Sequence, residues 1–320
     1  MKSFLRLSVA ASLTLALIAS GSSGATAGQS ATGLAEPVRI GFEVRNGQPV
    51  TASGEKVTDY WTPERMAAAV PIAGPASNGT SDERAVASAE GYTLSVGNVY
   101  LTSASGRDVR CSGGAVDSPK KRLVLTAAHC VRGEEGFASN IVFAPGIRDG
   151  VSPVGEFAAT SVVVSPNWYI EAPDFNYAYD LAVLTMANGD VEDRPVGRVV
   201  EPFAIEWNTG YEHDNVTGMG YPGNPDAGGN QHHYEEVSTE RGECPDHLEG
   251  ECDVDNMVLG DFYCFSGSSG GPWVRNFNGE GSGTIISVIS LGAEGFPCYG
   301  PYLDDELKAV FDWAESFSPE

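Results

Sequence analysis

Short runs of β-branched and aromatic residues, separated by Gly, Pro, Asn and Asp, dominate the chain after residue 90. Runs of this kind predict β-strands. No amphipathic segment of about 10–15 residues lies between them, so we expect an antiparallel barrel or sandwich and not alternating α/β units. The predicted strands cover residues 96–101, 123–126, 141–143, 161–164, 181–184, 215–219 and 284–290.

The last segment of the chain has a helical pattern. Within residues 304–317, Leu307, Val310, Phe311 and Ala314 recur at a spacing that places them on one helix face. Acidic residues begin the segment, where the helix dipole favours negative charge. We therefore predict a C-terminal helix that packs its apolar face on the barrel preceding it in sequence.

The first 27 residues have the pattern of a signal peptide. Lys2 and Arg6 precede an uncharged apolar run at 7–19, and small residues close the segment at Ala25-Thr26-Ala27. This run is shorter than the ~18 residues needed to cross a bilayer, and no later stretch is long enough. The chain is therefore expected to be secreted, extracellular and not bound to membranes.

Residues 28–90, here called the N-terminal segment, contain few large apolar residues and many Ala, Gly, Ser and Pro. Such a composition does not support a core of its own, so we interpret this part as a removable pro-segment that is mostly loop-like. One short helix is expected, with Thr62 as its cap and Pro63 in its first turn. The segment is expected to end near residue 90 or at Arg84-Ala85, which leaves residues 91–320 as the functional domain.

The chain of 320 residues carries a net charge of −24. An acidic surface of this kind repels nucleic acid and anionic membranes. We interpret the charge first as an adaptation for solubility and second as a field that attracts basic substrates. We expect a monomer.

Three short motifs carry candidate chemistry: Thr126-Ala127-Ala128-His129-Cys130, Asp180-Leu181-Ala182-Val183-Leu184 and Gly267-Ser268-Ser269-Gly270-Gly271-Pro272. Taken alone, they read as a structural histidine, the start of a strand and a flexible turn. Taken together, they supply a base, a carboxylate to orient it and a serine nucleophile, the three groups of serine acyl transfer. The glycines allow backbone N–H groups to turn inward, so the amides of Gly267 and Ser269 are expected to form an oxyanion hole.

These motifs resemble those of the chymotrypsin/trypsin family of serine peptidases, and the resemblance extends over residues 96–317. It implies two six-stranded antiparallel β-barrels with His129, Asp180 and Ser269 in the cleft between them, and no cofactor. Secondary matches at 61–66, 143–146 and 220–223 resemble bacterial secreted trypsin-like peptidases, which include glutamyl endopeptidases. The expected substrate is a protein or peptide, and the peptidase is expected to be made as a secreted zymogen.

The serine motif also fits Gly-x-Ser-x-Gly, the nucleophile turn of α/β-hydrolases. That fold requires its histidine after the serine, whereas the last histidine of this chain is His247. The order His129, Asp180, Ser269 is the chymotrypsin-like one.

Six cysteines form an even set, typical of disulfides in an exported protein, and six allow fifteen pairings. The resemblance implies Cys111–Cys130 and Cys264–Cys298, which leaves Cys244–Cys252 as a local pair. A metal site at Cys244, His247 and Cys252 is a less favoured alternative, and we expect no metal. His213, His232 and His233 show no ligand spacing and are expected to be solvated loop residues.

The sequence departs from the family at two places. Ser268 stands where the family has the aspartate that pairs with the freed N-terminal amine, so the oxyanion hole must be ordered in another way, and the pro-segment is a candidate to block the cleft. The residue at the base of the specificity pocket is Tyr263 or Phe262, depending on how the loop is aligned, with Asp261 adjacent. No histidine follows Ser269 to meet an acidic substrate. We expect cleavage after apolar or aromatic residues first, basic residues second and acidic residues third.

The predicted function is therefore a secreted serine endopeptidase. The alternative is an inactive binding protein on the same fold, because one fold can host unrelated functions. Reaction of Ser269 with a serine-directed probe distinguishes the two.

Overall fold

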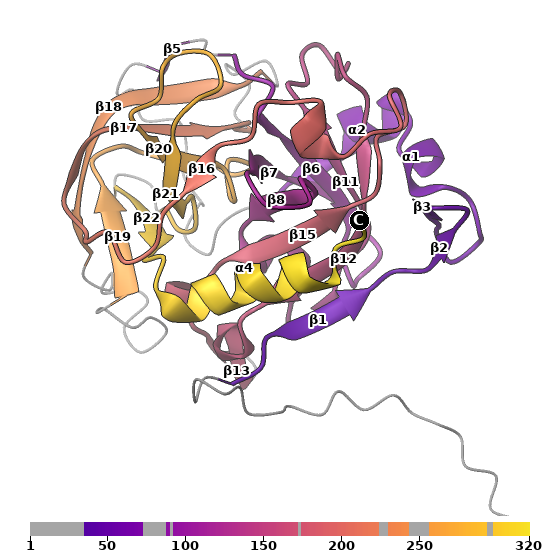
Figure 1. The fold of residues 1–320 in the computed structure, drawn as a ribbon, viewed down its shortest axis with the longest axis horizontal. Coiled ribbons are helices and arrows are strands. Elements are labelled where there is room, and N and C mark those ends of the chain that lie inside the picture. The colour runs from indigo at the N-terminus through magenta and orange to yellow at the C-terminus, as the bar shows by residue number, and fades with distance from the viewer. Residues whose placement is uncertain are drawn as a thin grey trace, which may run out of the picture.

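Strand-forming runs assemble into two β-sheets in the computed structural model, which describes residues 35–72, 88–89, 92–171, 174–223, 230–242, 256–292 and 297–320. Figure 1 shows the two sheets side by side, with the C-terminal helix α4 running across the front of the molecule. Within the part of the chain that the structure describes, no helix is long and apolar enough to cross a membrane.

The first sheet is a closed barrel in the order β12-β11-β6-β7-β8-β15, and pairing of β15 with β12 completes the ring. The inward side chains of these strands, with Val99, Phe143 and Leu184 among them, are fully buried. The strands are β6 (Val96–Thr102), β7 (Asp108–Val116), β8 (Leu123–Thr126), β11 (Ser139–Pro145), β12 (Phe157–Val164) and β15 (Ala182–Met186).

The second sheet has the order β16-β21-β20-β17-β18-β19-β22. A bridge between Leu291 and Tyr299 connects the chain just after β21 back to β22, so six of these strands curve round a second core that contains Phe262 and Trp273. The strands are β16 (Ala204–Ile205), β17 (His213–Gly220), β18 (His232–Arg241), β19 (Met257–Gly260), β20 (Pro272–Arg275), β21 (Thr284–Val288) and β22 (Cys298–Pro301). The predicted all-β class with two barrels is confirmed.

The predicted C-terminal helix is α4 (Asp305–Phe317), and its four apolar positions are buried as expected. Asp304 caps it by accepting hydrogen bonds from the Glu306 and Leu307 amides at 2.9 Å. The helix packs on β12 and β15 of the first barrel, not on the second barrel that precedes it in sequence. Glu306 explains this placement, because its carboxylate accepts hydrogen bonds from Ser165 and Asn167 just beyond β12.

Residues 35–72 of the N-terminal segment contain more regular structure than their composition predicts. They wrap the first barrel with two helices and four short strands, drawn in indigo and violet in Figure 1. Thr62 caps α2 as predicted, accepting a hydrogen bond from the Arg65 amide, while Trp61 and Met66 are 2% and 3% exposed. For this stretch the expectation of a loop-like segment is wrong, because its few large apolar side chains pack against the outward-facing apolar residues of the barrel strands. The elements are β1 (Val38–Gly41), β2 (Val44–Arg45), β3 (Gln48–Pro49), α1 (Val57–Tyr60), α2 (Pro63–Ala68) and β4 (Val70–Pro71).

The remaining elements are short connections. Strand β5 pairs with β18, β9 with β10, and β13 with β14. These elements are β5 (Ser88–Ala89), α3 (Ala128–Val131), β9 (Arg132–Gly133), β10 (Gly136–Phe137), η1 (Pro166–Trp168), β13 (Tyr169–Glu171), β14 (Asp174–Phe175), η2 (Tyr177–Tyr179) and η3 (Val196–Arg198).

Candidate active site

His129 lies in the single turn of helix α3, directly after β8 ends at Thr126. A disulfide between Cys111 on β7 and Cys130 fastens this turn to the barrel. The turn brings both the backbone amide and the ring of His129 to one carboxylate, that of Asp180. His129 is therefore held at two points.

Asp180 is fully buried at the start of the chain leading into β15. Its Oδ1 accepts a hydrogen bond from the His129 amide at 2.8 Å, and its Oδ2 accepts from His129 Nδ1 at 2.7 Å. A third donor, Ser290 Oγ, reaches Oδ2 at 2.5 Å. A buried carboxylate is tolerated when donors of this kind surround it. The arrangement places a hydrogen on Nδ1 of His129 and leaves Nε2 as an acceptor.

Sequence reasoning missed Ser290. It follows β21 and is 1% exposed. The available signal was a hydroxyl at the end of a run of apolar strand residues, where a buried polar group needs a partner.

His129 Nε2 is itself buried and has no hydrogen-bond partner among the described residues. Ser269 lies nearby and is 2% exposed, and its backbone carbonyl accepts a hydrogen bond from the Ser112 amide at 2.8 Å. No hydrogen bond between Ser269 Oγ and His129 Nε2 is present among these residues. Such catalytic hydrogen bonds often tighten only when substrate binds.

The loop around Ser269 depends on two glycines with positive φ, Gly267 at 89° and Gly270 at 80°. A Cβ at Gly270 would collide with Thr126 Oγ1 and would lie 2.6 Å from the Ala127 amide nitrogen. The loop therefore packs directly against the turn that carries His129, and a larger residue at this position would separate the two.

Ser268 is fully buried, and its hydroxyl forms hydrogen bonds within the same loop. Its Oγ donates a hydrogen bond to the Phe265 carbonyl at 2.5 Å and accepts one from the Phe265 amide at 3.2 Å. This closure accounts for an ordered loop without the aspartate that the resemblance leads one to expect at this position.

The Gly267 amide has a partner from the N-terminal segment. It donates a hydrogen bond to the carbonyl oxygen of Ile72 at 2.9 Å, while the Gly267 carbonyl accepts one from Ser112 Oγ. Ile72 and His129 line the same open cavity of about 420 Å³. One of the two predicted oxyanion donors is thus occupied by the chain's own backbone.

Of the residues predicted for the specificity pocket, the acidic one, Asp261, is exposed, whereas Phe262 and Tyr263 are buried or half-buried. Phe262 is fully buried in the core of the second barrel, with its ring 5.2 Å from that of Trp273. Asp261 is exposed, and its Oδ1 accepts a hydrogen bond from the Ser238 amide on β18. Tyr263 is half-buried, and the next residue forms the Cys264–Cys298 disulfide.

One group of potential metal ligands lies at the site among the described residues. Cys111, His129 and Cys130 lie close together, but both sulfurs belong to one disulfide. The predicted Cys244–Cys252 pair, the alternative metal site with His247 and the Arg84-Ala85 boundary all lie outside the described residues.

The expectation of solvated loop histidines is wrong for the described ones. His213 begins β17, and His232 and His233 lie on β18. His233 is 2% exposed, and its Nε2 hydrogen-bonds Gln231 Oε1 at 2.7 Å. Burial holds the pKa of His233 down at about 4.

Comparison with known proteins adds family information. A family model described as trypsin matches residues 89–302. The protease Anisep from Arthrobacter nicotinovorans is 23% identical over 72% of this chain and 99% of its own, with a TM-score of 0.60. A thermostable serine protease, AL20, from an extremophilic microorganism is 25% identical over 70% of this chain and 98% of its own, with a TM-score of 0.59. A Glu endopeptidase solved with MPD is 21% identical over 77% of this chain and 99% of its own, with a TM-score of 0.52. No curated protein matches.

Proposed function

The chain belongs to the trypsin family of serine peptidases, and on this basis we propose that it is a secreted endopeptidase that hydrolyses peptide bonds through an acyl-enzyme on Ser269. The observation that carries the proposal is the buried network of His129, Asp180 and Ser290, which leaves a single imidazole nitrogen, Nε2, without a partner. A purely structural histidine at this depth would use both ring nitrogens.

In the first step, His129 Nε2 takes the proton of Ser269 Oγ as the oxygen attacks the substrate carbonyl carbon. The resulting imidazolium is stabilised by Asp180, which already accepts the Nδ1 hydrogen bond. His129 then gives its proton to the leaving amine, and water repeats the sequence to release the acyl group. The chain's own residues supply every proton transfer, so no cofactor is needed.

The oxyanion of each tetrahedral intermediate would lie between the amides of Gly267 and Ser269. Gly267 reaches the required conformation because it lacks a Cβ, which at this φ would be strained. Ser112 helps to hold this residue in place, since its Oγ donates a hydrogen bond to the Gly267 carbonyl.

For the substrate we propose a protein or peptide with an apolar or aromatic residue before the cleaved bond. Asp261 is exposed and bonded to β18, so it is poorly placed to receive a basic side chain. No histidine follows Ser269 in the sequence to receive an acidic one. The name of the Glu endopeptidase describes that protein's activity alone.

We further propose that residues 1–27 direct export and that the N-terminal segment is a removable pro-segment. In support, the family model begins at residue 89, and 72% of this chain suffices to match 99% of the protease Anisep. The acidic net charge of −24 argues against nucleic acid or anionic membranes as partners. We expect the processed peptidase to act as a monomer.

The test is labelling of the processed protein with a fluorophosphonate, followed by peptide mapping. We expect one label on Ser269, and loss of both label and peptidase activity in Ser269→Ala, where removal of a triad serine costs about 10⁶ in turnover. A correctly folded, processed protein that takes no label would instead favour the inactive binding protein.

A further inference from the structure

The stretch 35–72 of the N-terminal segment reaches the candidate active site at its last residue, Ile72. Strand β4 pairs in parallel with β7, with Val70 opposite Val109 and Pro71 opposite Arg110. One residue later, the Ile72 amide donates to the Arg110 carbonyl at 2.9 Å, and the Ile72 carbonyl accepts from the Gly267 amide at 2.9 Å. The segment thus lies across the cleft by backbone hydrogen bonds.

The cleft is shaped to receive this strand. A Cβ at Gly223 would collide with Pro71, and a Cβ at Gly267 would lie 3.1 Å from Pro71 Cβ. Two glycines therefore make room for one proline. With Pro71 in this position, neither glycine has space for a side chain.

The bound carbonyl is not placed as a substrate carbonyl would be. Hydrolysis requires both oxyanion donors on the same oxygen. Among the described residues, Gly267 donates to Ile72, and no hydrogen bond joins the Ser269 amide to Ile72. The strand occupies a catalytic hydrogen-bond donor without presenting its own peptide bond for attack.

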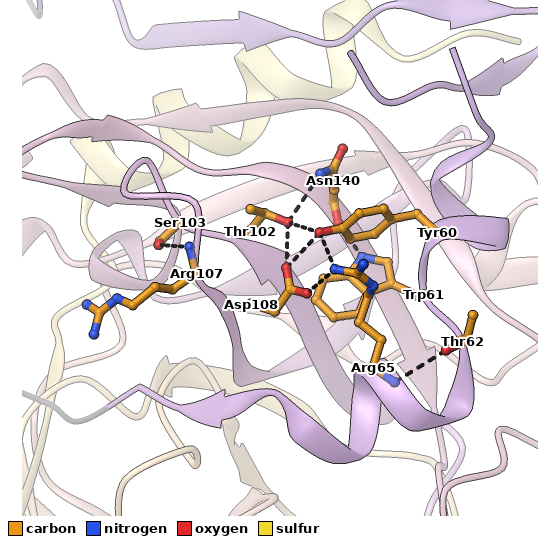
Figure 2. Close-up of polar contacts among 9 residues, drawn as sticks. All are labelled: Tyr60, Trp61, Thr62, Arg65, Thr102, Ser103, Arg107, Asp108 and Asn140. Carbon is orange, nitrogen blue, oxygen red and sulfur yellow. Dashed lines mark hydrogen bonds and ion pairs between the residues drawn. The ribbon is translucent and has the colours of Figure 1, made fainter. Parts of the chain in front are cut away.

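An anchor beside this strand holds it in place, and Figure 2 shows its polar contacts. Asp108, at the start of β7, accepts hydrogen bonds from Tyr60 at 2.9 Å and from Arg65 at 2.6 Å. Thr102 donates to the same carboxylate, whose side chain is 18% exposed. The Arg65 guanidinium also lies over the Tyr60 ring, 4.1 Å from its centroid.

Trp61 adds the apolar part of the anchor. Its side chain is 2% exposed, its ring lies 5.5 Å from that of Tyr100, and its indole N–H donates to the Asn140 carbonyl at 2.6 Å. A buried Trp with a satisfied N–H is a typical high-energy contact of an interface. Only a few residues separate Arg65 of the anchor from β4, which begins at Val70, so the anchor keeps the strand close to the cleft.

We infer that residues 57–72 are an inhibitor built into the chain: Trp61 and the Tyr60–Arg65–Asp108 cluster dock the segment on the first barrel, and Ile72 then occupies the oxyanion amide of Gly267. This inference rests on the proposed function, since it assigns the regulation of that same site. The partner that fits the surface formed by Asp108, Thr102 and Asn140 is therefore the chain's own N-terminal segment, before or after it is cut.

The experiment measures the rate of fluorophosphonate labelling of the uncut precursor, read from the full-length band on a gel. Labelling requires Ile72 to leave Gly267, so the rate reports how often the segment opens. We compare Trp61→Ala, Arg65→Met and the matched control Arg45→Met. Arg45 lies in the same segment and loses the same charge, but its described partner is Glu43 of its own hairpin.

We expect Arg65→Met to raise the labelling rate about three- to tenfold, because a partly exposed charge-assisted contact is lost. Trp61→Ala should raise it more than about a hundredfold, and Arg45→Met should leave it unchanged. All variants should label equally fast once the segment has been removed, which shows that the peptidase domain is intact.

The outcomes separate the two ideas. If the processed protein labels at Ser269 and the wild-type precursor labels equally fast, the inhibitor is refuted and the proposed function stands. If Arg45→Met accelerates labelling as much as Arg65→Met, the anchor is refuted. If neither precursor nor processed protein labels, the proposed function itself fails.

Discussion

Replacing Asp180 by Asn tests the site most sharply, because the carboxylate accepts from three donors and the amide can serve them in only one way. With the amide oxygen at the Oδ2 position, the amide NH₂ would face the His129 backbone N–H, and two donors would oppose each other. With the oxygen at the Oδ1 position, the NH₂ faces His129 Nδ1 and Ser290 Oγ. Both of these groups can change to acceptors, so this second arrangement satisfies every partner.

The second arrangement requires His129 to carry its hydrogen on Nε2. Nε2 then has no lone pair to take the proton of Ser269, although the heavy atoms hardly move. The same exchange in a Ser-His-Asp triad lowers kcat about 10⁴-fold. This factor corresponds to about 5 kcal/mol of activation free energy.

The assay measures hydrolysis, by the processed protein, of a peptide ester or amide with an apolar residue before the cleaved bond. In parallel, ¹⁵N NMR of the His129 imidazole shows which ring nitrogen carries the hydrogen. Asp312→Asn is the matched control, because Asp312 is exposed on α4 and pairs with Lys308. An Asp180→Asn protein that keeps more than about a tenth of wild-type kcat/KM, or one whose Nε2 remains unprotonated, would refute this account of the base.

Two further outcomes follow from buried groups. Ser268→Ala removes the hydroxyl that ties the nucleophile loop to Phe265. We therefore expect kcat/KM to fall about ten- to a hundredfold while the melting temperature changes little. An unaltered kcat/KM would mean that the loop is ordered without this hydroxyl. Burial lowers the pKa of His233 to about 4. Between pH 6.5 and 4 the unfolded chain therefore binds a proton that the folded chain does not. The free energy of unfolding should fall by about 3 kcal/mol as the pH falls through that range. Urea unfolding of Ser269→Ala with and without His233→Gln at pH 4 and 7 tests this, and an equal loss in both proteins would exclude His233 as the cause.

Strand periodicity predicted the parts of the fold that are apolar on both faces. Strands β6, β8, β12 and β15 consist almost wholly of buried residues, and each was expected, in whole or in part, from its β-branched and other apolar residues. The C-terminal helix was predicted equally well because the spacing of its apolar residues is regular over about two turns. The fold class and family are both confirmed.

Two of the strands that sequence reasoning missed, β7 and β18, have interrupted patterns. Strand β7 contains Gly113 and Gly114, which read as breakers, yet a Cβ at Gly113 would lie 2.8 Å from the Leu125 carbonyl. Strand β18 carries exposed glutamates between its buried positions, so its polarity hides it. In both strands, tertiary packing outweighs local propensity.

In the candidate active site, too, only some of the residues could be predicted from the sequence. His129, Asp180 and Ser269 could be chosen from their motifs, and the structure brings the His129 ring and the Asp180 carboxylate into contact. Ser290 and Ile72 could not, because neither belongs to a motif: one acts through a side-chain hydroxyl and the other through a backbone carbonyl. Backbone groups carry no residue signature in a sequence.

Strand β1 has a consequence for the fate of the molecule after maturation. It pairs with residues 161–164 of β12, whose opposite side already pairs with β15. Departure of the N-terminal segment would uncover a row of unpaired backbone groups along a Ser-Val-Val-Val edge, the kind of template on which chains add to one another. The active peptidase would then have an open cleft but lower colloidal stability, and a cut segment that stays docked through β1 would keep the enzyme dispersed.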